Sequence, residues 1–233
     1  MKVLKFGGTS VGTPGSLRQV KNIVTSYDGR VAVVVSALGG ITDSLVKASS
    51  LAENGDASFT GILDGIRERH LLMCDELIAG GEARRILKEK INALCDRLDE
   101  ICRGVYMLGV LPRKTKDEIL SFGERLSSLI VAEVIPGGCL YDSLQFIRTR
   151  RSGKSDTADI QTSYPLIREA FAGYEMSDAI AIVPGFISAD SDSGQITNLG
   201  RGGSDYSASL IAAALDAEQL EIWTDVDGFM TAD

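Results

Sequence analysis

Short apolar runs alternate along this chain with longer segments in which apolar residues recur every three or four positions. Val31 to Val35 is an unbroken run of valine and alanine, which is typical of a strand buried on both faces of a parallel sheet. Val3, Leu4 and Phe6 form a shorter run, and residues 179–183 and 220–224 are further strand candidates. Helical spacing predicts helices at 16–27, 44–53, 64–79, 82–102 and 116–134, the last opening with a capping-box pattern from Thr115 to Glu118.

Strands that alternate with helices predict an α/β fold. We expect a mostly parallel central sheet sandwiched between helices in three layers. The segments 149–159 and 189–196 are polar and rich in Gly, Ser and Asp, so we expect exposed loops there, the first resembling a lid on the substrate side. Ligands of such sheets bind at the carboxyl ends of the strands, so the residues that follow each strand are the first candidates for a site.

The segment Thr197 to Tyr206 is the most informative part of the chain. Its three glycines allow close approach of the backbone to a ligand, and Arg201 offers a planar cation suited to a carboxylate. Ser204 and Asp205 lie where a helix is expected to begin, and free N–H groups at a helix start favour phosphate or carboxylate. The spacing fits neither a dinucleotide fingerprint nor a P-loop. The alternative is an ordinary glycine-rich turn with a Ser or Asp helix cap.

Lys5 lies inside the first apolar run, directly before the glycine pair Gly7 and Gly8. An ammonium group in such a run is costly unless it has a partner. It could extend into water from an edge strand, or it could face phosphate groups, since phosphoryl transfer depends on positioned positive charge.

Two further polar positions have both a structural and a functional interpretation. Ser36 and Thr42 flank a flexible turn after the second strand, and they could simply cap the helix expected near Ser44. Glu124 follows Gly123 inside a predicted helix. Because a mid-helix glycine costs roughly 1 kcal/mol relative to alanine, it predicts close approach of another group. From the pattern alone, the favoured interpretation of Glu124 is a solvated side chain on the helix surface, paired with Arg125 or another neighbour.

Composition narrows the chemistry. Apolar residues make up 44% of 233 residues, enough for a sizeable core, and the net charge of −8 argues against nucleic acid or an anionic membrane as the main partner. No apolar run is long enough to span a bilayer. The pattern of a strand begins with the first residues, so we expect no signal peptide.

The four cysteines form no Cys-x-x-Cys pair and are expected to be reduced. The single histidine, His70, is expected on a solvated helix surface, so lysine, arginine and carboxylates must carry the chemistry.

Four motifs follow one another along the chain: Lys5–Val11 (KFGGTSV), Phe122–Glu124 (FGE), Leu199–Tyr206 (LGRGGSDY) and Trp223–Gly228 (WTDVDG). In this order they resemble aspartate kinase, a member of the amino acid kinase superfamily, over almost the whole chain from Lys5 to Asp233. The amino-acid sequence of residues 1–5 and 221–228 is most similar to that of the forms fused to homoserine dehydrogenase.

The resemblance implies ATP-dependent phosphorylation of the β-carboxylate of L-aspartate to 4-phospho-L-aspartate, the first step towards lysine, threonine and methionine. It implies ATP as the nucleotide, with Mg²⁺ carried by ATP and no metal ligand in the chain. It also implies three groups of residues. The catalytic residues are Lys5 and Asp205. The aspartate-binding residues are Ser36, Thr42, Glu124, Arg201 and Ser204. The nucleotide-binding residues are Lys5, Gly7, Gly8, Thr224, Asp225 and Met230, the last of which stands where the family often has tyrosine.

The resemblance also sets expectations for the whole protein. Residues 1–233 correspond to the catalytic domain, and the sequence stops at Asp233, where the family continues with Pro-Arg and a lysine-containing loop. We therefore expect a truncated catalytic domain without regulatory domains, cytoplasmic, and homodimeric in the full-length enzyme. The alternatives are an inactive ligand-binding or dimerisation module of the same fold, or a kinase of acetylglutamate, glutamate or a nucleoside monophosphate.

Overall fold

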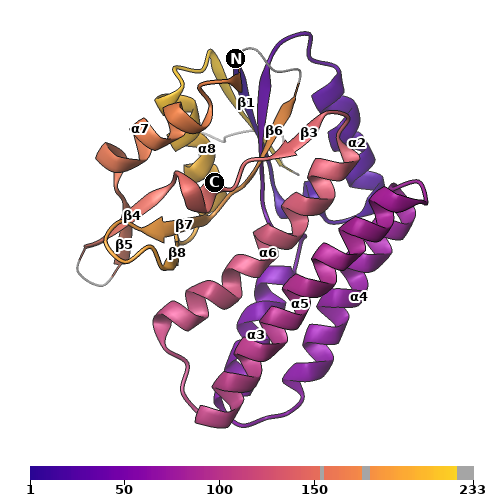
Figure 1. Ribbon diagram of the computed structural model, residues 1–233, viewed down its shortest axis with the longest axis vertical. Helices are drawn as coiled ribbons and strands as arrows, with labels where there is room; N and C mark the ends of the chain where they lie inside the picture. The colour runs from indigo at the N-terminus through magenta and orange to yellow at the C-terminus, as the bar shows by residue number, and fades with distance from the viewer. Residues whose placement is uncertain (153–154, 175–178, 225–233) are drawn as a thin grey trace, which may run out of the picture.

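A computed structural model of the protein describes residues 1–152, 155–174 and 179–224. Within these residues, the central sheet has five strands in the order β3-β6-β2-β1-β9 (Figure 1). The bounds are β1 Lys2–Phe6, β2 Val31–Val35, β3 Gly138–Leu140, β6 Ile180–Pro184 and β9 Gln219–Trp223. All neighbouring strands are parallel, so the predicted α/β sheet is confirmed.

Helices cover both faces of this sheet because alternate strand side chains enter two separate cores. Leu4 and Val33 belong to the core shared with α2 to α6, whereas Val3 and Val34 belong to the core shared with α7 and α8. The helices are α1 Gly8–Val11, α2 Pro14–Thr25, α3 Ile41–Glu53, α4 Phe59–Leu77, α5 Glu82–Leu108, α6 Arg113–Val134, α7 Ile160–Ala170 and α8 Gly203–Ala214. The predicted three layers are confirmed.

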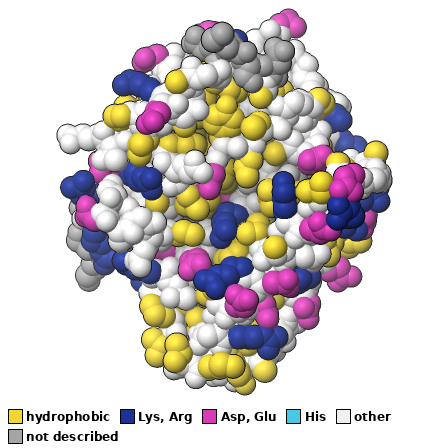
Figure 2. Space-filling model, viewed as in Figure 1, with side chains coloured by type: hydrophobic (Ala, Val, Ile, Leu, Met, Phe, Trp, Pro, Cys, Tyr) yellow, Lys and Arg dark blue, Asp and Glu magenta, His cyan; other side chains and the backbone are white. Residues whose placement is uncertain are grey.

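The helices α3 to α6 extend beyond the sheet as a bundle (Figure 1). Exposed hydrophobic side chains gather at its free end (Figure 2), where Met107 and Leu108 at the end of α5 are 81% and 77% exposed. None of the helices in the described parts of the chain is both long and apolar enough to cross a membrane.

A second sheet includes the first of the two segments predicted to be loops. Its order is β5-β4-β7-β8, with bounds β4 Arg148–Ser152, β5 Ser155–Ala158, β7 Ile187–Asp190 and β8 Ile196–Asn198. The prediction of a loop at 149–159 is therefore wrong, whereas residues 191–195 of the second predicted loop form a largely exposed turn between β7 and β8. Thr149, Ser188 and Thr197 are buried, and their hydroxyl groups bond to one another at 2.6 and 2.9 Å, so polar side chains form the interior here.

Several helix starts also differ from the prediction. α3 begins at Ile41, so Thr42 lies in its first turn rather than in a loop, and α4 begins at Phe59, five residues earlier than predicted. α6 begins at Arg113 after Pro112, which fixes a backbone angle suited to a helix start, and no side chain caps it. The predicted capping box at Thr115 is therefore wrong.

His70 is fully buried in α4 and does not lie on a solvated surface as predicted. The hydrophobic side of α4 includes this position because Ile66, Met73 and Cys74 surround it along the helix. Cys74, Cys95 and Cys102 are buried free thiols and Cys139 is an exposed one.

Candidate active site

The sequence-predicted residues meet in one cleft at the carboxyl ends of the central strands. β1 leads into Gly7 and Gly8, and β2 leads into Ser36, which lies beside the end of β1 because its N–H donates to the carbonyl of Phe6 at 3.2 Å. A cavity of about 390 Å³ lies here. Its lining includes Lys5, Gly8, Ser36, Thr42, Glu124, Arg201, Ser204 and Asp205.

Two of the predicted nucleotide contacts, Gly7 and Thr224, are not among the lining residues of the cavity. The N–H of Gly7 donates to the carbonyl of Trp223 at the end of β9 at 3.3 Å. Thr224 follows β9 at the same edge of the sheet and is exposed. Asp225 and Met230 lie outside the described residues.

Lys5 reaches this cleft from the middle of the sheet. β1 lies between β2 and β9, so the alternative of an edge-strand lysine is wrong. The side chain is almost buried, and its Nζ lies 2.7 Å from Oδ1 of Asp205 in the first turn of α8. A lysine in an interior strand is thus compensated by a carboxylate that itself remains 44% exposed to the cleft.

Glu124 supplies a buried carboxylate with one free oxygen. Its Oε1 accepts a hydrogen bond from the N–H of Ala37 at 3.1 Å, while its Oε2 has no hydrogen-bond partner among the described residues. Burial raises the pKa of Glu124 to about 8, and the backbone hydrogen bonds offset part of that rise. The alternative of a solvated glutamate is therefore wrong, and a cationic ligand in the cleft could satisfy Oε2.

Gly123 allows Glu124 to come close to the loop that follows β2. A Cβ at Gly123 would lie 2.8 Å from the Cβ of Ala37, so only glycine lets α6 approach this loop. The close approach predicted from a mid-helix glycine is present. It sets the 3.1 Å hydrogen bond between Ala37 and Glu124.

Arg69, which the sequence analysis did not identify, holds the two glycine-containing loops together. From α4, its guanidinium donates to the carbonyl of Gly39 at 2.7 Å and to that of Gly12 at 2.9 Å. The N–H of Gly39 in turn donates to the carbonyl of Gly8 at 2.9 Å. A side chain that binds backbone carbonyls leaves no recognisable pattern in the sequence, so only the structure reveals these contacts of Arg69.

The amino end of α8 faces the cleft without a side-chain cap. Gly202 precedes the helix with φ of 73°, and no Ser or Asp side chain accepts from the first N–H groups. The alternative of an ordinary Ser or Asp cap is therefore wrong. The N–H of Gly203 donates to the carbonyl of Gly200 at 2.9 Å, and the N–H groups of Ser204 and Asp205, which have no acceptor among the described residues, remain available to an anion. Arg201 is exposed on the same loop, with no hydrogen bond or ion pair to the described residues.

Phe186 is a second residue of the cleft that the sequence did not identify. It has φ of 65°, in the left-handed region that non-glycine residues rarely adopt. Its N–H donates to Oγ of Ser207 at 2.9 Å, and a Cβ on Gly203 would lie 2.8 Å from its ring. The signal in the sequence is limited to the preceding Pro184-Gly185.

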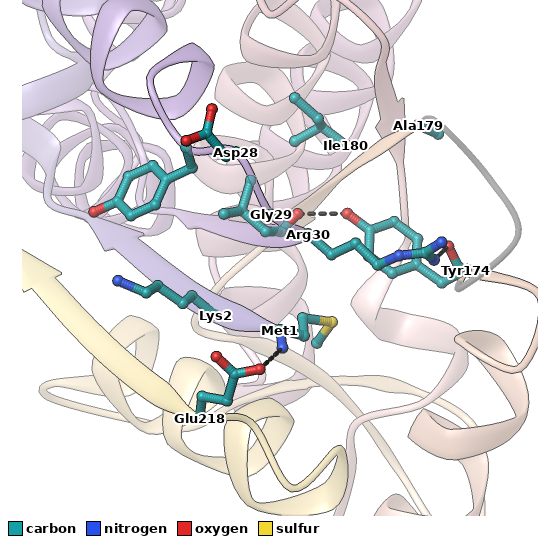
Figure 3. A pocket seen from close by; sticks show the side chains of 11 residues that line it. Met1, Lys2, Asp28, Gly29, Arg30, Tyr174, Ala179, Ile180 and Glu218 are labelled. Carbon is teal, nitrogen blue, oxygen red and sulfur yellow. Dashed lines mark hydrogen bonds and ion pairs between the residues drawn. The ribbon is translucent and has the colours of Figure 1, made fainter.

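A larger cavity, of about 610 Å³, opens at the amino ends of the strands (Figure 3). Its cationic groups already have partners among the described residues. The terminal amine of Met1 pairs with Glu218 at 2.8 Å, Lys2 pairs with Glu221 at 3.2 Å, and Arg30 donates to the carbonyl of Tyr174. Within the described residues, the smaller cleft has a carboxylate oxygen and a guanidinium without partners, so it is the better candidate for a ligand that carries both charges.

Comparisons with known proteins identify relatives of this chain. The sequence matches the amino acid kinase family over residues 1–233. It is 32% identical over 242 residues to chloroplastic aspartokinase 2 of Arabidopsis thaliana, covering 99% of this chain and 43% of that protein. It is 33% identical over 239 residues to the chloroplastic bifunctional aspartokinase/homoserine dehydrogenase 1 of the same plant, covering 99% of this chain and 26% of that protein. Fused and unfused relatives therefore match at similar identity.

The fold is similar to that of Escherichia coli aspartokinase III, solved in complex with aspartate and ADP. The TM-score is 0.85 at 31% identity, and the match covers 98% of this chain and 50% of the solved one. The chain thus spans half or less of the length of each of these relatives.

Proposed function

Because this chain belongs to the amino acid kinase family, we propose that it is the catalytic domain of an aspartate kinase, which transfers the γ-phosphoryl group of ATP to the β-carboxylate of L-aspartate. The observation that carries the proposal is the pairing of opposite binding groups in one cleft. Glu124 offers an unpaired carboxylate oxygen and Arg201 a free guanidinium. An α-amino acid carries the complementary ammonium and carboxylate.

In this proposal, Arg201 holds the α-carboxylate by two parallel hydrogen bonds. Glu124 accepts from the α-ammonium, and Ser36, Thr42 and Ser204 contribute polar contacts from the loops that line the cleft. These contacts would leave the β-carboxylate of aspartate free to react.

The proposed transfer needs no general base. A β-carboxylate oxygen attacks the γ-phosphorus, the new O–P bond forms as the bond to the bridging oxygen breaks, and ADP leaves with the electron pair. The side chain of aspartate is ionised at neutral pH, so it has no proton to lose. Lys5 would stabilise charge on the phosphoryl oxygens, and Asp205 would hold Lys5 in place.

We propose that Gly7, Gly8 and the uncapped start of α8 receive the phosphate groups, and that Thr224, Asp225 and Met230 contact the rest of the nucleotide. In this proposal, Mg²⁺ arrives bound to the phosphate groups of ATP. The solved relative with aspartate and ADP supports both ligand classes.

An ADP-release assay with a panel of acceptors tests the proposal. We expect turnover with L-aspartate and little with L-glutamate, N-acetyl-L-glutamate or a nucleoside monophosphate. Turnover with another acceptor in preference to aspartate would assign a different kinase of the family. Calorimetric binding of aspartate without turnover would identify a ligand-binding module instead. Light scattering and cell fractionation test the further expectations of a homodimer and a cytoplasmic location.

A further inference from the structure

A groove separate from the candidate active site lies between α5, α6 and the end of β3. Its volume is about 380 Å³, and it shares no lining residue with the cleft around Lys5. Arg125 on α6, directly after Glu124, lines it together with Lys90 on α5. Figure 2 shows basic and hydrophobic side chains side by side near the middle of the face along which α6 runs.

The guanidinium of Arg125 has no acceptor in the part of the chain that the structure describes. It is partly buried, its Cζ lies 4.7 Å from the centroid of the Phe122 ring, and it makes no hydrogen bond or ion pair with the described residues. Five N–H donors are therefore unsatisfied by protein, although a partly buried cation is stable only with compensation. Burial lowers the pKa of Arg125. The nearby carboxylates of Asp142 and Glu118 raise this pKa, and the positive charge of Arg97 lowers it.

The charge and polarity of the groove define what could fill it. Lys90 is exposed and also lacks an ion pair within the described residues. Only one lining carboxylate, Asp142, opposes the two cations, and its Oδ1 already accepts from the N–H of Leu144 at 3.1 Å. The groove is therefore net positive in a chain of net charge −8.

The remaining wall is apolar. Leu94 and Leu129 line the groove from the two helices, and Leu140 at the end of β3 is 40% exposed beside them. An inorganic anion would leave this wall in water, whereas an anion attached to an apolar group would cover it.

We propose that this groove binds a small organic anion, with its carboxylate or phosphate group on Arg125 and Lys90 and its apolar part on Leu94, Leu129 and Leu140. The planar guanidinium stacked on Phe122 is already held in one orientation, so less conformational freedom is lost on binding.

The test uses two fluorinated probes, two competitors and the whole chain. 4-Fluorobenzoate is titrated and observed by ¹⁹F NMR, with 4-fluorobenzyl alcohol as the neutral probe and phenyl phosphate and inorganic phosphate as competitors. We expect 4-fluorobenzoate to bind with a Kd of about 1 mM or tighter. Phenyl phosphate should compete with it. The alcohol lacks the anionic group and inorganic phosphate lacks the apolar group, so each should bind at least about 10-fold more weakly. Equal binding of acid and alcohol, or no saturable binding, would overturn the proposal.

Variants locate the probe. Arg125→Gln should weaken 4-fluorobenzoate about 10- to 100-fold, as expected for a lost charge-assisted contact, while Arg125→Lys should retain part of the affinity. Leu140→Ser should weaken the aromatic acid and leave inorganic phosphate unchanged. Arg103→Gln, an exposed change elsewhere on α5, is the matched control, and Arg201→Gln should leave binding intact. Loss of binding in Arg201→Gln with normal binding in a folded Arg125→Gln protein would place the anion in the candidate active site and refute the groove.

Discussion

Lys5 and Asp205 form an ion pair of 2.7 Å between an interior strand and the first turn of α8. The two residues are 200 positions apart in sequence, and only the return of α8 onto β1 brings them together. In the proposed kinase, this pair fixes a cation at the edge of the cleft, in the position where phosphoryl charge would develop.

Removing the ammonium should therefore affect the chemical step more than substrate binding. We expect Lys5→Ala to lower kcat by roughly 10²–10³-fold, the typical loss for one electrostatic donor, with a much smaller change in the aspartate Kd. ADP release and calorimetry measure the two quantities. Lys2→Ala on the same strand, whose side chain pairs with Glu221, is the matched control. Near-normal turnover in Lys5→Ala would show that this lysine is only structural.

Asp205 should orient Lys5 and should not act as a base. We expect Asp205→Asn to lower kcat without removing an ionisation from the pH–rate profile, because the attacking carboxylate has no proton to lose at neutral pH. Asp192→Asn, on an exposed turn, is the control. A wild-type profile that rises through one acidic pKa and loses it in Asp205→Asn would assign the base role to this residue.

Arg201 should recognise the α-carboxylate through the shape of its guanidinium. Arg201→Lys keeps the charge but loses the two-point contact, so we expect the aspartate KM to rise at least about 10-fold while kcat changes little. Steady-state kinetics with varied aspartate measures both. Arg97→Lys, an exposed change on α5, should leave KM unchanged. An unchanged KM in Arg201→Lys would mean that the arginine does not contact the acceptor.

The sequence predicted the central sheet well because burial on both faces requires continuous apolar strands. Residues 31–35 were predicted as a strand and form β2 with the same bounds, and the strand predicted at 179–183 lies one residue from β6. The glycine-rich motifs likewise predicted which loops would meet. The structure adds that Lys5 lies in an interior strand, which the short run around it could not distinguish from an edge.

The sequence failed where tertiary contacts outweigh composition. Thr149 is a polar residue that is buried in the second sheet, where it bonds to the hydroxyl of Thr197, so the sequence predicted a loop for its segment. Arg69 acts through backbone carbonyls, and Phe186 through an unusual backbone angle. His70 lies among charged residues in sequence, although its own side of α4 is buried.

Because His70 is buried, we predict that it lowers the stability of the protein at acidic pH. Its Nδ1 lies 2.7 Å from the carbonyl of Ile66, so the neutral ring donates from Nδ1, and Nε2 has no partner among the described residues. Burial lowers the pKa of His70 to about 4, against 6.5 for the ordinary group. Between these values the unfolded chain binds more protons, so this residue's contribution to stability is present above pH 6.5 and is lost as pH falls towards 4.

We expect wild type to lose about 2–3 kcal/mol more unfolding free energy than His70→Leu between pH 7 and pH 4.5, as the shift in pKa implies. Urea unfolding at the two pH values measures this difference. The comparison between proteins cancels the titration of carboxylates that both share. Parallel losses in the two proteins would mean that His70 is accessible to protons in the folded state.

Glu124 should couple aspartate binding to proton release. Burial holds the pKa of its carboxyl at about 8, so the group is mostly protonated at pH 7 in the free protein. A ligand ammonium beside Oε2 favours the ionised form, and binding must then release a proton. Below pH 8, aspartate affinity should therefore rise with pH, by about tenfold per unit between pH 6 and 7.5. Calorimetry in buffers of different ionisation enthalpy should show release of about one proton.

Two variants separate this coupling from a general effect of pH. Glu124→Gln keeps the size and the hydrogen bond from Ala37 but cannot ionise, so its aspartate binding should be weaker at pH 8 and nearly independent of pH. Glu118→Gln, on the same helix but outside the lining of the cleft, should behave as wild type does. If wild-type binding releases no proton and does not change with pH, then Glu124 is already ionised in the free protein or does not contact the ammonium, and its proposed role is wrong.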